Sequence, residues 1–112
     1  AGLADAIITL SLGLAGHVSG TVGVIVPPSR LGATTRLAMS DPRLAALEER
    51  LIVVTALQAK GLEYDGVLVV CPDEIVTEAP GAERVLYVAL TRATQRMAVL
   101  DVGTSVWRTA LS

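Results

Sequence analysis

Four short, almost uninterrupted apolar runs constrain the fold of this chain more than any other feature. They are TVGVIV at 21–26, LIVVT at 51–55, GVLVVC at 66–71 and MAVLDV at 97–102. The runs are rich in β-branched residues and too short for typical helices, so we expect strands. Strands that are apolar along their whole length are buried on both faces, as in parallel sheets covered by helices. The sequence therefore predicts an α/β fold with a mostly parallel sheet.

Helical patterns lie between and beyond these runs. Helices are predicted over 3–15, 42–49, 83–95 and 104–111. Over 3–15, leucine and isoleucine recur at spacings of three and four, which places them on one helical face. Asp41 followed by Pro42 is typical of an N-cap and the first helical position. Residues 31–40 fit neither pattern clearly.

Loops are predicted where the chain leaves the strands. The prolines and glycine of 72–81 favour a loop there, and the polar stretch 56–65 favours a loop or a single helical turn. In open parallel sheets, functional groups gather at the carboxyl ends of the strands. The segments 27–30, 56–65 and the loop after Cys71 are therefore the places to look for a site.

Composition and length exclude several classes of protein. The 112 residues match one domain, and a hydrophobic content of 52% with 18% charged residues excludes a disordered chain. The single cysteine, Cys71, excludes a disulfide framework and favours a reducing compartment. A net charge of -2 argues against a broad nucleic-acid-binding surface. The apolar stretch 6–15 is too short to span a bilayer and lacks the basic flank of a signal peptide. Because the chain starts without Met, we expect a piece of a longer protein or a processed form.

No complete catalytic set is visible. The only lysine, Lys60, lies in A-K-G-L, so the chain has no G-x-x-x-x-G-K-[ST] phosphate loop, and it lacks a C-x-x-C and a pair of histidines. We expect His17 to be structural or to cap the carboxyl end of a helix, and Cys71 to be a small buried hydrophobe. Asp73 and Glu74 are expected to be solvated carboxylates, so no metal site is predicted.

Two segments do carry a recognisable pattern. T-A-L-Q-A-K-G-L-E-Y-D at 55–65 resembles motif V of the UvrD/Rep-type superfamily 1 helicases, whose core reads K-G-L-E-[FY]. L-Y-V-A-L-T-R-A at 86–93 resembles their motif VI, whose core reads Y-V-A-x-T-R-A. The resemblance covers 51–102 well and 21–50 weakly, with 21–36 in the place of motif IV.

The resemblance implies that 1–112 is a single C-terminal RecA-like lobe, a three-layer α/β sandwich. Such a lobe completes an ATP site whose phosphate loop and Mg²⁺ site belong to an N-terminal RecA-like lobe of the same protein. By the family pattern Arg92 is the arginine finger, Glu63 accepts a hydrogen bond from the ribose, and Gly61 allows close backbone approach to ATP. Thr55 and Lys60 are weaker matches, for coupling to nucleic acid.

Each assignment has a plain structural alternative. Without the motif, Arg92 would be an ordinary salt-bridge residue, Glu63 a solvated carboxylate and Gly61 a turn glycine. Tyr87 fits core packing better than base stacking. The motif context makes the functional role the favoured interpretation for Arg92 and Glu63 only.

Departures from the family pattern narrow the expected function. Leu57 stands where DNA-unwinding members often have histidine, and Arg30 and Arg36 are both weak candidates for the motif IV arginine. Only about 25 residues separate the strands at 21–26 and 51–55, so the usual accessory domain is absent or very reduced. These features resemble the HelD-like branch, ATPases that recycle bacterial RNA polymerase.

The sequence therefore favours a cytoplasmic bacterial ATPase acting on RNA polymerase. A DNA-unwinding repair helicase, or a non-catalytic interaction module derived from a motor lobe, remains the alternative. The isolated chain is expected to be inactive and to self-associate through the cleft face that its missing lobe would cover.

Overall fold

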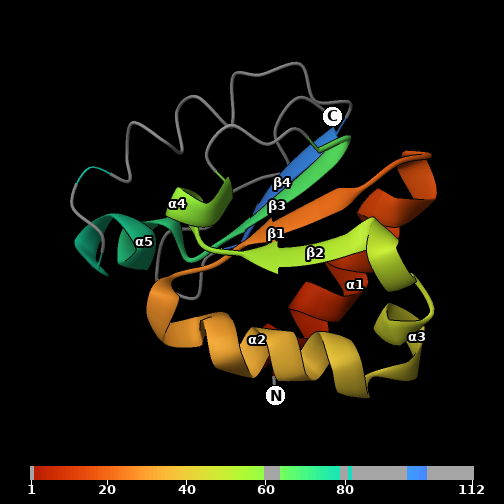
Figure 1. The fold of residues 1–112 in the computed structure, drawn as a ribbon, viewed down its shortest axis with the longest axis horizontal. Helices are drawn as coiled ribbons and strands as arrows, with labels where there is room; N and C mark the ends of the chain where they lie inside the picture. The colour runs from red at the N-terminus through yellow and green to blue at the C-terminus, as the bar shows by residue number, and fades with distance from the viewer. Residues whose placement is uncertain (1, 60–63, 79–80, 82–95, 101–112) are drawn as a thin grey trace.

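The computed structural model describes residues 2–59, 64–78, 81 and 96–100 (Figure 1). Four strands form one sheet in the order β2-β1-β3-β4, and every neighbouring pair is parallel. The strands are β1 (Val22–Ile25), β2 (Leu51–Val54), β3 (Gly66–Val70) and β4 (Arg96–Leu100). Each lies within or at the edge of a predicted apolar run, so the predicted α/β fold with a parallel sheet is confirmed.

The register brings the carboxyl ends of the strands to one edge of the sheet. In the centre, Val22 of β1 is aligned with Leu51 of β2 and with Gly66 of β3. Gly66 is in turn aligned with Arg96 of β4. The segments that follow the strands therefore start from the same edge.

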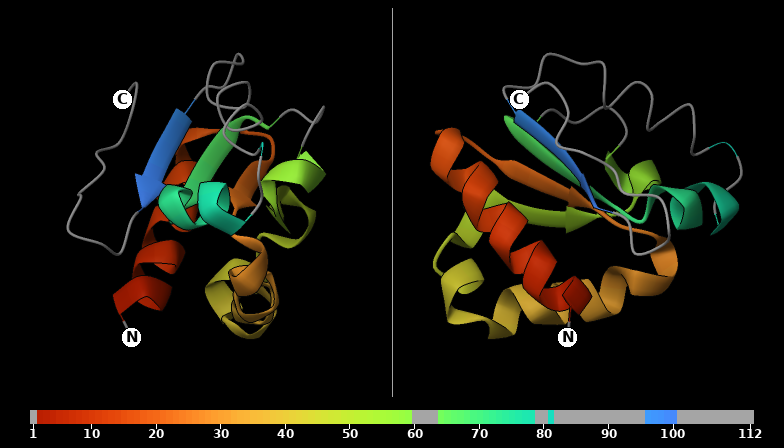
Figure 2. Two further views of the ribbon diagram at one scale, coloured as in Figure 1. Left: turned by 90° about the vertical axis from the view of Figure 1, so that its left-hand side faces the viewer. Right: turned by 180° about the vertical axis from the view of Figure 1, so that it is seen from behind.

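Helices cover both faces of the sheet. One face carries α1 (Gly2–His17), α2 (Pro28–Ser40) and α3 (Pro42–Ala45). The short helices α4 (Ala56–Ala59) and α5 (Pro72–Glu78) lie on the other side, as the views in Figures 1 and 2 agree. Among the described helices, none is both long enough and apolar enough to cross a membrane.

Side chains alternate between two core clusters, which explains the uninterrupted apolar runs. Toward α1 and α2 the strands present Val22, Val24, Val26, Leu68 and Val70. Toward α4 and α5 they present Ile25, Val67 and Val69, which pack with Ala56 and Ile75. Because both faces are covered, consecutive residues of β1 and β3 are all buried, those of the edge strand β2 are partly buried, and branched aliphatic residues fill both layers.

Two helices differ from the sequence expectation. The predicted loop over 72–81 is wrong, because α5 occupies Pro72–Glu78. A proline at the first helical position gives up an amide that has no helical partner anyway, and burial of Ile75 anchors the turn to the sheet. The ambiguous residues 31–40 belong to α2, which begins at Pro28 for the same reason.

The predicted cap at Asp41 is confirmed. Its carboxylate accepts hydrogen bonds from the backbone N–H groups of Arg43 at 2.9 Å and Leu44 at 3.4 Å. The predicted helix over 42–49 is split, because α3 ends at Ala45 and a 3₁₀ turn, η1 (Glu48–Arg50), precedes β2. The predicted helices over 83–95 and 104–111 lie outside the described residues.

Two basic residues hydrogen-bond to carbonyl groups at and just after the carboxyl end of α1. His17 Nδ1 lies 2.8 Å from the Gly13 carbonyl oxygen, in agreement with the expected capping role. Arg50 donates from Nε to the carbonyl of Gly20 at 3.0 Å, and from Nη2 to the carbonyls of Ala15 at 2.9 Å and Val18 at 2.8 Å. One guanidinium therefore satisfies a carbonyl in the last turn of α1 and two carbonyls in the segment that follows it.

Candidate functional site

All three segments expected to carry function start from the carboxyl edge of the sheet. β1 runs through the buried Pro27 into α2, β2 runs through Thr55 into α4, and β3 runs through Cys71 into α5 (Figure 1). In the left view of Figure 2 this edge faces the reader, and α5 lies beside the start of α2. Strand ends at such an edge are where open α/β folds bind ligands.

A double clamp joins α2 and α5 at this edge. Arg30 donates from Nε to Glu74 Oε1 at 2.8 Å and from Nη2 to Glu74 Oε2 at 3.0 Å. Ser29 donates from its backbone N–H to Glu78 Oε1 at 2.9 Å and from its hydroxyl to Glu78 Oε2 at 2.6 Å. The hydrogen bond from Arg30 to Glu74 raises the pKa of Arg30 above its usual value. The expectation that Glu74 is only a solvated carboxylate is wrong, because a partner far along the chain reaches it.

The start of α4 is a capping box. The Thr55 N–H donates to Gln58 Oε1 at 2.9 Å, and the Gln58 N–H donates to Thr55 Oγ1 at 3.3 Å. Thr55 therefore fixes the direction in which the chain leaves β2 toward Lys60. The T-x-x-Q spacing of Thr55 and Gln58 is typical of a capping box, and it is the sequence pattern from which the role of Gln58 could be predicted. Leu57, on the same turn, has 57% of its surface exposed.

Tyr64 anchors the chain where it returns to the sheet. Its ring lies over Gly23 in β1, so close that a β-carbon there would sit 2.7 Å from the ring. Burial raises the pKa of the Tyr64 phenol. Its hydroxyl is buried and has no hydrogen-bond partner among the described residues. The fit of ring to glycine places the end of the predicted motif V segment on the central strand.

Cys71 forms the corner between β3 and α5. It is buried, as expected, and has a φ of 52°, a left-handed conformation that is uncommon for a residue other than glycine. Its N–H donates to the Leu100 carbonyl at 2.6 Å. The corner therefore sets the direction of α5 relative to the two strands beside it.

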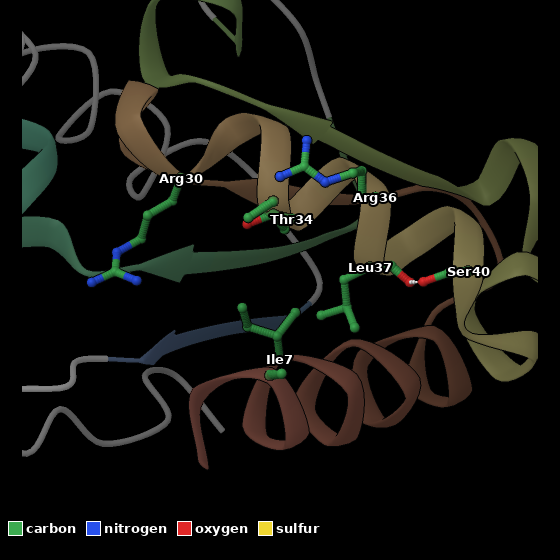
Figure 3. A pocket seen from close by; sticks show the side chains of 8 residues that line it. Ile7, Arg30, Thr34, Arg36, Leu37 and Ser40 are labelled. Carbon is green, nitrogen blue, oxygen red and sulfur yellow. Dashed lines mark hydrogen bonds between the residues drawn. The ribbon is translucent and has the colours of Figure 1, made fainter. Parts of the chain in front are cut away.

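The two candidate motif IV arginines lie in different places (Figure 3). Arg30 is in the first turn of α2, and its guanidinium points toward α5 at the carboxyl edge. Arg36 is further along α2, exposed, and borders a pocket of about 330 Å³ between α1 and α2. The pocket is lined by Ala4, Ile7, Arg30, Ala33, Thr34, Arg36, Leu37 and Ser40.

The remaining predicted site residues are not placed by the structure. Lys60, Gly61, Glu63 and Arg92 lie outside the described residues. Of the predicted set, Thr55 alone is described. Within the described part of the chain, no group of three or more His, Cys, Asp or Glu side chains could hold a metal ion.

Comparison with known proteins agrees with this arrangement. Residues 51–100 match the family described as the UvrD-like helicase C-terminal domain. The fold is similar to the crystal structure of the C-terminal domain of a possible DNA helicase from Lactobacillus plantarum WCFS1. The TM-score is 0.56 at 23% identity, covering 89% of this chain and 66% of that one. No curated protein sequence matches the chain significantly.

The matched segment runs from β2 to β4, and so includes both stretches in which motifs V and VI were predicted. The described chain spans about two thirds of the similar structure's length. Its four-stranded parallel α/β sheet is consistent with the fold of a RecA-like helicase C-terminal domain, and residues 51–100 match the model of the UvrD-like helicase C-terminal domain.

Proposed function

We propose that this chain is the C-terminal motor lobe of an ATP-dependent superfamily 1 helicase or translocase. The observation that carries the proposal is the family match over 51–100, on a parallel sheet whose carboxyl edge collects the ends of β1, β2 and β3. In this proposal the lobe binds ATP in a cleft against an N-terminal lobe, and hydrolysis drives the two lobes together and apart.

The roles of individual residues follow from the motif match. ATP arrives with Mg²⁺, held mainly by the other lobe. Arg92 neutralises charge on the transferring phosphoryl group, since its planar and permanently charged fork suits phosphate oxygens. Glu63 accepts a hydrogen bond from the ribose, and Gly61 lets the backbone approach. Lys60 and Thr55 couple the nucleotide to the nucleic-acid track, with Thr55 acting through the capping box that orients α4.

The structure supports Arg30 rather than Arg36 as the motif IV arginine. Both arginines border the pocket beside α1, but Arg30 is in the first turn of α2 at the carboxyl edge and bonds to α5, whereas Arg36 lies further along α2. A guanidinium has five N–H donors, and the bidentate bond to Glu74 uses one from Nε and one from Nη2. The donors that remain suit a phosphate oxygen, so the residues at this edge fit a nucleotide.

The test is ATP turnover by the full-length protein. Arg92→Ala should abolish turnover and leave binding of a fluorescent ATP analogue largely intact, because the finger acts on the transition state. Arg36→Ala is the matched control and should keep wild-type turnover. The isolated 112 residues should show none. Wild-type turnover in Arg92→Ala would refute the finger assignment, and turnover by the isolated chain would refute the two-lobe proposal.

A HelD-like role at RNA polymerase in the bacterial cytoplasm is the more specific form of the proposal. Its support is Leu57, which is exposed on α4 and cannot hydrogen-bond a phosphate. The full-length protein should then retain RNA polymerase in a pull-down and fail to displace the strand of a tailed duplex. Strand displacement without polymerase binding would favour the DNA-unwinding alternative. Absence of any ATP turnover in the intact protein would favour a non-catalytic module.

A further inference from the structure

We propose that Glu74 is a positioning residue for ATP turnover, which holds the guanidinium of Arg30 in one orientation toward the nucleotide. The inference rests on the proposed function and concerns the same cleft. Both carboxylate oxygens of Glu74 accept hydrogen bonds from Arg30, so its proposed contribution acts through Arg30.

The geometry of the pair restricts Arg30 in a specific way. Nε and Nη2 form one side of the planar guanidinium, and both donate to the Glu74 carboxylate at 2.8 and 3.0 Å. Two parallel hydrogen bonds fix the plane of the fork as well as its position. Nη1, on the other side of the fork, takes no part in either bond to Glu74, and within the described part of the chain its two hydrogens can face a ligand. A long, mobile side chain is thereby ordered before the nucleotide arrives, which lowers the cost of ordering it on binding.

Glu74 is itself held by the fold. Glu74 and Glu78 lie one helical turn apart, so their carboxylates share a face of α5, opposite the neighbouring Ser29 and Arg30 of α2. Ile75 lies between these two residues in the sequence. Its side chain is fully buried and packs α5 against the sheet. In the partner helix, α2 begins at Pro28 with Pro27 as its N-cap, and the proline rings restrict the backbone φ angles there. Both halves of the clamp are therefore fixed relative to the strand ends.

The pair is open enough to serve a ligand. The Arg30 and Glu74 side chains keep 35% and 37% of their surface exposed. Solvent screens their mutual attraction at this exposure, so the pair adds little stability. Its orienting effect does not depend on that stability, because the bidentate geometry alone selects the orientation.

The experiment measures steady-state ATP hydrolysis by the full-length protein. Glu74→Ala should lower kcat/KM by about tenfold, mainly through a higher KM, because Arg30 is present but no longer oriented. Glu74→Gln should fall between Glu74→Ala and wild type, since its amide oxygen can still accept one hydrogen bond. Asp41→Asn is the matched control, because it removes a carboxylate from the Arg43 pair, away from the carboxyl edge, and keeps a capping side chain. It should leave kcat/KM unchanged.

A charge-swapped variant separates positioning from simple bracing of α5. Arg30→Glu combined with Glu74→Arg restores an ion pair between α2 and α5, and so should unfold at the wild-type temperature while turnover stays low. Recovery of turnover in the swap would overturn the inference in favour of a brace. Wild-type kcat/KM in Glu74→Ala, with turnover lost in Arg92→Ala, would overturn it while leaving the proposed function in place. A full-length wild type without ATP turnover would overturn both.

Discussion

Gly23→Ala adds one methyl group at the centre of the sheet and should destabilise the protein. The new β-carbon would lie 2.7, 2.8 and 2.9 Å from Cδ2, Cγ and Cε2 of Tyr64. Carbon atoms pack best at about 3.5–4.0 Å, so the ring would have to move by roughly 1 Å. It cannot move freely, because Tyr64 is buried in the cluster under α4 and α5 and β1 is paired on both sides.

The size of the effect follows from two opposing terms. Overpacking of this kind costs about 1–3 kcal/mol. Replacing glycine by alanine in a strand returns about 0.5–1 kcal/mol of backbone entropy. The net loss should be about 1–2 kcal/mol, or on the order of 5–10 °C in the unfolding midpoint.

Urea unfolding followed by circular dichroism measures this loss. Gly13→Ala in α1 is the matched control, since nothing lies within 4 Å of its added β-carbon. It should stabilise the helix by up to about 1 kcal/mol. In a Tyr64→Ala background the obstructing ring is gone, so Gly23→Ala should no longer destabilise. Unchanged stability of Gly23→Ala with Tyr64 intact would refute the packing argument.

Three further changes test other contacts. Arg50→Lys should cost about 2 kcal/mol in urea unfolding, because an ammonium cannot reproduce the fork that reaches three carbonyls; an unchanged midpoint would show that those bonds add nothing. Ser11→Ala should raise stability by about 1 kcal/mol, because the Ser11 hydroxyl is fully buried and has no partner in the described part of the chain; a lower midpoint would mean that the hydroxyl is satisfied. Burial raises the pKa of Tyr64, so its contribution to stability is complete below the unfolded value of about 10 and is lost as the pH rises through the folded value. Tyr64→Phe should remove that alkaline loss of unfolding free energy, and the same loss in the variant would exclude Tyr64 as its source.

The strands were predictable because a strand buried on both faces has consecutive apolar residues, which can be recognised in the sequence alone. Two helices were not, because their deciding contacts are distant in sequence. The residues of α2 include glycine and three hydroxyl-bearing side chains before Arg36, so their helical periodicity is weak. In α5, Pro72 looked like a loop residue, and the burial of Ile75 that favours a helix is a tertiary contact.

The same limit applies to the site. Motifs V and VI could be read directly, since their residues are close together in the chain. The choice between Arg30 and Arg36 depended on where α2 begins, and the role of Glu74 on its contact with Arg30, 44 residues away. The fit of Tyr64 to Gly23 is likewise long-range. Motifs in the sequence identify residues that could take part in the chemistry, but they do not identify contacts between residues that are distant in the chain.

The central position of β1 has a consequence for the order of folding. Val22 is aligned with Leu51 and Gly66, so the first strand of the chain must wait for the next two before both of its edges are paired. Parallel pairing through such crossovers closes long loops early and slows folding. On the ribosome, the apolar residues of β1 would leave the exit tunnel well before β3 is made. Until then, helix α1, strand β2 once it is made, and transient chaperone contacts are the available cover for this strand.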